Sequence, residues 1–112
     1  MTNAKEELEQ LLKGKAKVKC ASITVDYPFD YKEARLKDIE DYVLFELKVN
    51  HTEEEFQSFL NSLNFDYDSG YGGQELFGTV WLEDGTWCTR GEYDGREWWI
   101  HNQLPEIPSE LL

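Results

Sequence analysis

Cysteine and long apolar runs are both scarce in this sequence. The chain has two cysteines among 112 residues, Cys20 and Cys88, and no apolar stretch that approaches the roughly 18 residues of a membrane span or forms the apolar core of a secretory signal. So few cysteines argue against a disulfide-stapled scaffold, and the lack of an apolar run argues against a membrane anchor. We therefore expect a cytoplasmic protein with reduced thiols and no membrane partner.

The chain also lacks the motifs that commonly bind cofactors, metals or phosphate. The glycine-rich stretch Gly70–Gly73 has neither the lysine nor the following helix of a phosphate-binding loop. A Cys/His zinc site would have to use four residues, Cys20, His51, Cys88 and His101, and these do not have the short spacing that is usual for zinc ligands. We expect no cofactor and no metal.

Basic residues are scarce in the second half of the chain. Residues 1–48 carry nine basic and ten acidic side chains, a net charge of −1, whereas residues 49–112 carry only Arg90 and Arg96 against thirteen acids, a net charge of −11; together these give the total of −12. The negative electrostatic field of the second half of the chain repels nucleic acid and anionic membranes and attracts basic surfaces. We expect a protein partner with a basic surface and no direct nucleic-acid binding.

Aromatic residues, by contrast, make up 14% of the chain, which predicts an ordered core despite the charge. Two segments have helical apolar spacing, Thr2–Lys13 and Thr52–Leu63. The second opens with Thr52 and places Glu55 three residues on, the pattern of a reciprocal capping box. One apolar stripe of this helix is expected to lie across a sheet: Phe56, Phe59, Leu60 and Leu63.

Two further segments alternate as strands, Lys15–Val25 and Tyr42–Val49, and the Pro-containing stretch Asp26–Asp41 between them is predicted to be a loop. The second strand presents one apolar face that is expected in the core: Val43, Phe45, Leu47 and Val49. Asn64–Gly73 is predicted to be a turn-rich loop.

Gln74–Gln103 reads as three antiparallel strands joined by two-residue turns at Asp84-Gly85 and Asp94-Gly95. Two-residue turns would set Trp81 beside Cys88 and Cys88 beside His101. The whole pattern predicts a single α+β domain, residues 1–112, with a mostly antiparallel five-stranded sheet in the order helix, strand, strand, helix and three-stranded meander, and with both helices on one face.

This register divides the meander into two faces. One face would place Trp98 over Gly78 and Gly91. The other would carry Trp81, Arg90 and Trp99, and because helices cover only one face, we expect these three to remain partly exposed. Exposed Trp beside Arg is the composition of a binding hot spot.

The acidic residues form the second part of the candidate binding surface. Rigid strands, tight turns and a capped helix would hold carboxylates at fixed positions where they imitate nucleic-acid phosphates, although solubility alone would also explain them. The candidates are Glu53, Glu54, Asp66, Asp68, Glu83, Asp84, Asp94 and Glu97.

Other functions remain open at this point. Cys88 beside His101 could form a nucleophile and its base in a small enzyme or ligand-binding domain, or could be a buried filler beside a polar strand end. Glu92 opposite Glu97 could be an acid/base pair, or a pair neutralised by Arg90 or Arg96. The tryptophan face could also meet a second copy, so both monomer and homodimer are allowed.

The stretch Tyr71–Pro108 resembles the ends of small acidic uncharacterised proteins encoded by bacteriophages, in its segments YGGQELFGTVWLEDGTW, RGEYDGREWW and PEIP. The resemblance covers about a third of the chain and brings no defined catalytic or binding positions. The resemblance implies a context in which small phage proteins often bind and inhibit a host enzyme or defence complex. We expect this chain to be a non-enzymatic protein that binds a protein partner and inhibits a nucleic-acid-handling host or defence protein.

Overall fold

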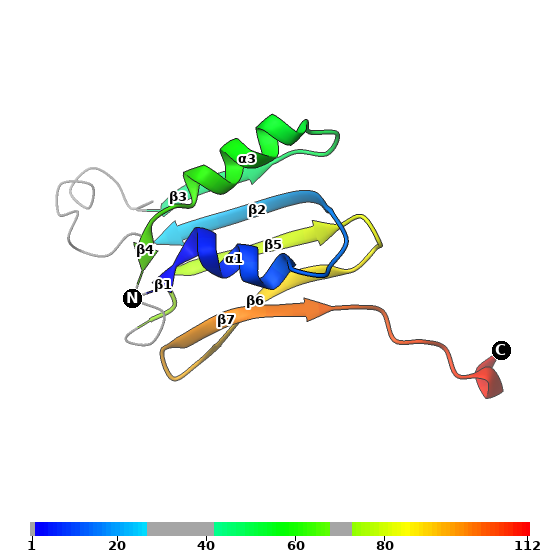
Figure 1. Ribbon diagram of the computed structural model, residues 1–112. Coiled ribbons are helices and arrows are strands. Elements are labelled where there is room, and N and C mark those ends of the chain that lie inside the picture. The colour runs from blue at the N-terminus through cyan, green and yellow to red at the C-terminus, as the bar shows by residue number, and fades with distance from the viewer. Residues whose placement is uncertain (1, 27–41, 68–72) are drawn as a thin grey trace.

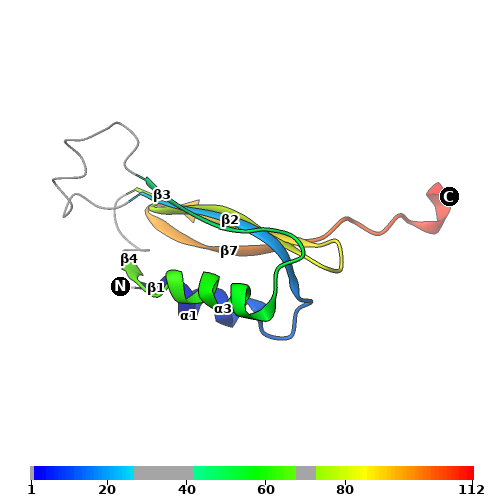
Figure 2. The same cartoon turned by 90° about the horizontal axis from the view of Figure 1, so that it is seen from above.

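The computed structural model describes residues 2–26, 42–67 and 73–112. In this part of the chain, two helices pack on one face of a five-stranded antiparallel sheet (Figures 1 and 2). The predicted α+β class, the sheet and the position of the helices on one face are confirmed.

Both helices begin at side-chain caps. Helix α1, Ala4–Leu12, begins after Asn3, whose side chain accepts a hydrogen bond from the Glu6 N–H at 3.0 Å. Helix α3, Glu53–Ser62, has the predicted capping box: the Glu55 N–H donates to the Thr52 hydroxyl at 3.1 Å, and the Thr52 N–H donates to the Glu55 carboxylate at 2.8 Å. The caps satisfy backbone donors that the first helical turn leaves without partners.

The sheet is built from strands close to the predicted ones. Their bounds are β2 Val18–Asp26, β3 Tyr42–Leu47, β5 Leu76–Leu82, β6 Trp87–Tyr93 and β7 Arg96–Asn102. Their order across the sheet is β3-β2-β5-β6-β7. A second, two-stranded sheet pairs β1, Thr2–Asn3, with β4, Asp66–Tyr67. β1 lies at the start of the segment predicted to be helical, and β4 lies in the stretch predicted to be loop. Such short strands carry no alternation that a sequence pattern could detect.

The core lies between the helices and the sheet. Ile23 and Val25 on β2 are each 1% exposed, and Leu47 on β3 is buried as expected. Val43 and Val49 were also expected in the core, but they are 38% and 48% exposed. Both lie at or beyond the ends of an edge strand, where less of the fold covers them.

The first hairpin of the meander differs from the predicted register. Val80 pairs with Cys88 and Trp81 with Trp87, so the loop has three residues rather than two. Leu82 closes it, donating to the Thr86 carbonyl at 2.9 Å, and Gly85 has a φ of 86°. A three-residue loop with glycine in the left-handed region is the next most common hairpin, and here it was preferred to the two-residue turn.

The second hairpin has the predicted two-residue turn. Asp94 and Gly95 both have positive φ, 51° and 85°, and Cys88 pairs with His101 as expected. The first hairpin is shifted by one residue and the second is not, so the two faces of β6 and β7 are exchanged relative to the prediction. The side chains of β6 and β7 that were expected to face away from the helices face toward them, and the others face away.

Two predicted segments are wholly or partly outside the described residues. The loop Asp26–Asp41 is described only at Asp26, which ends β2, and Asp68 and most of Gly70–Gly73 are likewise outside. The segment 103–112 follows β7, extends from the body of the fold and ends in a short 3-10 helix, Ser109–Leu111 (Figure 1).

Candidate functional site

The sheet face opposite the helices carries a group of large apolar side chains, which we call the open face. No helix of the described chain lies over this face (Figure 2). Its centre is a row of small hydroxyl residues, Ser22, Thr79 and Thr89, on neighbouring strands. Aromatic and aliphatic residues flank this row: Leu44, Phe77, Trp81, Trp87, Trp98 and Ile100.

The flanking residues of the open face are substantially solvent-exposed. Phe77 is 39%, Trp81 42%, Trp98 41% and Ile100 39% exposed. Single exposed apolar residues are ordinary on protein surfaces, but a contiguous group of this size on one flat sheet face is typical of an interaction site.

Trp98 has a fixed place on the open face. It pairs with Gly91, and a Cβ atom at Gly91 would lie 2.9 Å from the Trp98 indole nitrogen and 2.6 Å from the Ile100 Cδ1 atom. The indole therefore lies against the glycine, as predicted. Gly78 is not part of this arrangement, because it pairs with Ile23 on the other side.

The predicted cluster of Trp81, Arg90 and Trp99 is not formed. Trp81 lies on the open face, but Arg90 and Trp99 lie on the helix-covered face, and the Arg90 side chain is only 2% exposed. The one-residue shift of the first hairpin accounts for the separation. Sequence reasoning missed Trp98 and Ile100 as exposed neighbours of Trp81 for the same reason, whereas Phe77 lies on the face of Trp81 as expected.

Arg90 is the centre of a buried hydrogen-bond network (the Arg90 network). Its guanidinium donates to Glu97 at 2.8 Å, to Glu7 of α1 at 3.2 Å and to the Tyr67 hydroxyl at 2.8 Å. The guanidinium also lies over the Trp99 ring, 4.9 Å from its centroid. This network joins α1, β4, β6 and β7.

The same network fills the seam between β5 and β6. The backbone pairing of β5 with β6 stops at Thr79 and Thr89. Nearer the start of β5, side chains bond its backbone instead: the Leu76 N–H donates to Glu97 at 3.0 Å, and the Leu76 carbonyl accepts from Arg90 Nε at 3.3 Å. These side chains take the hydrogen bonds that a paired backbone would otherwise make. The arrangement is that of a structural ion pair rather than of an acid/base site.

The pKa values of this network follow from its burial. Burial alone would lower the pKa of Arg90, but its hydrogen bond to Glu97 and the charge of Glu7 raise that pKa above its ordinary value. Burial also raises the pKa of Tyr67, and its bond to Glu7 adds to the effect. Arg90 stays charged and Tyr67 stays neutral.

The candidate acidic residues are divided between the ends of the fold. Glu97 is an exception, since it is buried against Arg90 and cannot belong to a negative surface. Glu53 at the start of α3 and Glu83 at the first hairpin line the same hollow, whereas Asp66 lies on β4 near the opposite end of the sheet (Figure 1). Asp94 forms the second hairpin turn, also at that opposite end.

Cys88 and His101 are neighbours, as predicted. Cys88 is fully buried, and burial raises the pKa of its thiol. His101 is hydrogen-bonded through Nε2 to the Thr86 hydroxyl at 2.9 Å. A nucleophilic cysteine needs an accessible thiolate with a lowered pKa, and this environment has the opposite effect.

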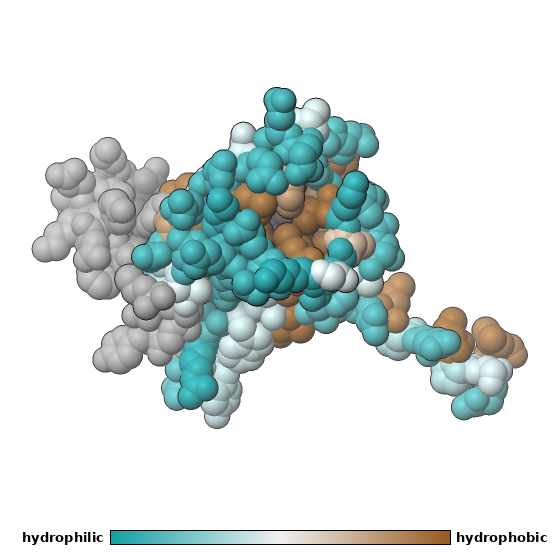
Figure 3. Space-filling view, viewed as in Figure 1, coloured by the Kyte–Doolittle hydropathy of each residue, from teal (hydrophilic) through white to brown (hydrophobic). Residues whose placement is uncertain are grey.

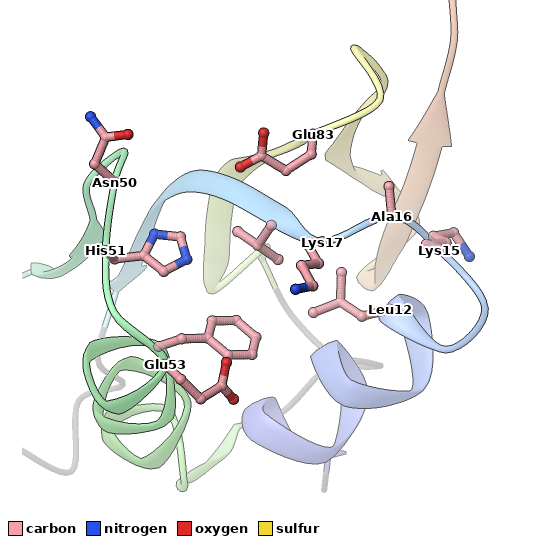
Figure 4. Close-up of a pocket in the computed structure, with 10 residues that line it drawn as sticks. Leu12, Lys15, Ala16, Lys17, Asn50, His51, Glu53 and Glu83 are labelled. Atoms are coloured by element: carbon pink, nitrogen blue, oxygen red, sulfur yellow. The ribbon is translucent and has the colours of Figure 1, made fainter.

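A hollow of about 500 Å³ opens between the end of α1 and the start of α3 (Figure 4). Its apolar lining is Leu12, Ala16, Val18 and Phe56, and its polar lining is Lys15, Lys17, Asn50, His51, Glu53 and Glu83. Figure 3 shows hydrophobic side chains within the gap between the helices, ringed by hydrophilic ones.

His51 presents a ring nitrogen to the hollow. Its Nδ1 lies 2.8 Å from the Lys48 carbonyl oxygen, which can only accept, so Nδ1 carries the proton in this bond. The ring stacks on Phe56 with centroids 6.0 Å apart, and Figure 4 shows it pointing into the hollow. No residue of the described ranges is hydrogen-bonded to Nε2, which is therefore available to a ligand group.

Within the described part of the chain, no group of three or more His, Cys, Asp or Glu side chains is placed to hold a metal ion. Among the same residues, no helix combines the length and apolar character required to cross a membrane. Comparison of the chain with protein-family models, curated proteins and solved structures found no match.

Proposed function

We propose that this protein is a non-enzymatic binding module that holds a partner protein against its open face. One observation carries the proposal: Phe77, Trp81, Trp98 and Ile100 are each about 40% exposed on the same uncovered side of a sheet. Tryptophan is enriched at the centres of protein interfaces. Hydrogen-bonded strands also hold these side chains in place before binding, which limits the entropy lost on association.

The partner in this proposal has an apolar patch bordered by basic residues. Asp26 and Glu46 lie on the same sheet face as the aromatic side chains, on the β2 and β3 side. The chain also carries a net charge of −12, which accelerates encounter with a basic surface. The resemblance to bacteriophage proteins makes a nucleic-acid-handling host or defence protein the finer form of this proposal.

The test compares partner binding by variants of two faces. The wild-type chain captures proteins from a host-cell lysate, and the purified candidate is then titrated by calorimetry. Trp81→Ala and Trp98→Ala each remove an exposed indole, and we expect each to weaken binding by about tenfold or more. Gln57→Ala on the outer surface of α3 is the matched control and should bind as the wild type does.

A partner that binds both tryptophan variants with wild-type affinity would contradict this proposal. Thermal unfolding of each variant must be measured alongside, so that lost binding is not confused with lost folding. Both indoles are more than a third exposed, so their removal leaves most of the core contacts in place.

A second candidate function is imitation of nucleic-acid phosphates. Glu53 and Glu83 come from distant parts of the sequence and line the same hollow, with Glu54 and Asp84 adjacent in the chain. For this function, Glu54→Lys with Asp84→Lys should cost more affinity than Trp98→Ala, and binding should weaken steeply with salt. Binding that is indifferent to salt would eliminate it.

A further inference from the structure

Residues 103–112 form an extended arm with exposed apolar side chains. The arm leaves the end of β7 and points away from the body of the fold (Figures 1 and 2). Four of its residues are largely uncovered: Leu104 is 77%, Ile107 62%, Leu111 73% and Leu112 89% exposed. Exposed apolar side chains on an outstretched segment gain free energy by docking on an apolar surface.

The arm has the reach and stiffness to dock on another molecule. Pro105 and Pro108 fix their own φ and disfavour helix at the residues before them, so less entropy is lost when the arm binds. The six residues 103–108 that precede the 3-10 helix span about 20 Å when extended, and the four spacings of about 4.8 Å in a five-stranded sheet add up to about 19 Å. The arm can therefore cross the whole width of one layer of this fold.

The hollow between α1 and α3 has matching chemistry. Its floor contains Leu12, Val18 and Phe56, and its volume of about 500 Å³ is within the range of ligand-binding pockets. Lys15 and Lys17 lie on its β2 side, and neither forms an ion pair with any described residue. Figure 4 shows the Lys17 side chain near Leu12 on the wall of the hollow.

The charges of the arm complement those lysines. Glu106 precedes Ile107 and Glu110 precedes Leu111, so each apolar side chain of this pair has a carboxylate beside it. Glu53 and Glu83 also line the hollow and would repel these carboxylates. This sets the orientation of a docked arm, with its acids along the Lys15 and Lys17 side.

The geometry points to an exchanged-arm dimer, in which residues 103–112 of each copy dock in the hollow between α1 and α3 of a second copy. The arm of this chain points away from its own fold, as an exchanged segment does. Exchange across a two-fold axis fills both hollows and covers both arms. The hollow and the open face are different surfaces, so the dimer and the proposed partner can coexist.

The test uses full-length chains with reversed charges on one side or the other. One chain carries Lys15→Glu with Lys17→Glu in the hollow, and the other carries Glu106→Lys with Glu110→Lys in the arm. Sedimentation equilibrium should show that the wild type dimerises and that each variant alone does so at least about tenfold more weakly. A control with Lys13→Glu and Lys19→Glu, two exposed lysines outside the hollow, should dimerise like the wild type.

Mixing the two variants decides whether the arm is exchanged between copies. In a mixed dimer, one hollow is wild type and receives a wild-type arm, while the other has both charges reversed and receives the complementary arm. We expect the mixture to dimerise within about threefold of the wild-type affinity, a difference of about 0.65 kcal/mol. An arm bound to its own chain would give a monomer in every case.

A wild-type chain that remains monomeric at millimolar concentration would overturn the inference, as would a mixture that fails to dimerise. The arm variant keeps the test decisive if the hollow variant misfolds. Its two substitutions lie on an exposed segment outside the core, so a wild-type dimer that it leaves unchanged also overturns the inference.

Discussion

At the scale of single residues, the strongest energetic constraint is the buried pair of Arg90 and Glu97. Arg90→Met would leave Glu97 buried without its cation and would remove one of the two side-chain donors of the Leu76 carbonyl, leaving the Gln74 amide. Removing one partner of a buried pair typically costs about 3–5 kcal/mol. We expect that loss in the free energy of unfolding, measured by urea denaturation.

Arg96→Met is the matched control for this prediction. Arg96 is exposed and forms no ion pair with the described residues, so its replacement should change stability by less than about 0.5 kcal/mol. Equal stability of the two variants would show that the Arg90 network does not hold the strands together.

Glu55 makes a pH-dependent contribution to stability. Its bonds with the backbone and side chain of Thr52 lower its pKa below the ordinary value of 4.5. The unfolded chain therefore takes up this proton first as the pH falls, and the stabilisation, present above pH 4.5, is lost as the pH falls through the folded pKa. Glu55→Gln should be less stable than the wild type at pH 7 and equally stable at strongly acidic pH.

Urea unfolding across this pH range measures that difference. If the free energies of unfolding of the wild type and of Glu55→Gln differ by the same amount at every pH, the ionised carboxylate contributes nothing to the cap.

The two cysteines should differ in reactivity. Burial raises the pKa of Cys88 and covers its sulfur, whereas Cys20 is partly exposed on β2. We expect a thiol reagent at neutral pH to label Cys20 much faster than Cys88, as followed by mass spectrometry. Rapid labelling of Cys88 in the folded protein would restore the nucleophile hypothesis.

At the scale of elements, the first hairpin loop between β5 and β6 depends on a glycine in the left-handed region. Gly85 has a φ of 86° and a Cβ there would meet nothing within 4 Å, so Gly85→Ala carries only the conformational cost, about 1–2 kcal/mol. At Gly78, with a φ of 152°, a Cβ would lie 2.4 Å from the Ser22 carbonyl oxygen. Gly78→Ala should therefore destabilise more.

Thermal unfolding of the two variants gives the comparison. Gly85→Asn is the control, because asparagine tolerates positive φ, and it should recover part of the loss. A Gly85→Ala variant as stable as the wild type would contradict the left-handed conformation in this loop.

The elements themselves could be predicted from the sequence, because helices and strands differ in apolar period and Thr52 and Glu55 mark a helix start. The register of the first hairpin could not. Asp84-Gly85 fits a two-residue turn by propensity, but the three-residue loop places Cys88 beside Val80 in the core and buries Arg90 beside Glu97. These long-range contacts, which local turn preferences do not include, decide between the two loops.

The candidate site was predictable to a lesser degree for the same reason. The exposure of Trp81 and the position of Trp98 over Gly91 could be predicted from the sequence. Which residues accompany Trp81 depended on the first hairpin, where one residue of register exchanges the two faces. One signal in the sequence favours the observed face of β6: cysteine is fully buried more often than tryptophan, so Cys88 is more readily placed in the core than Trp87.

At the scale of the whole molecule, the fold presents two unlike sides. The helical side is hydrophilic at its outer surface, with an apolar hollow between the helices (Figure 3). The sheet side carries the open face. In the proposed function, a partner protein covers this open face.

Hydroxyl-radical footprinting of the complex tests that claim directly, because it measures the solvent access of individual side chains. We predict that oxidation of Trp81 and Trp98 falls sharply when the partner binds, while Trp99, packed beside Arg90 under the helices, changes little. Unchanged oxidation of Trp81 and Trp98, with protection confined to the helices or the hairpin turns, would contradict it.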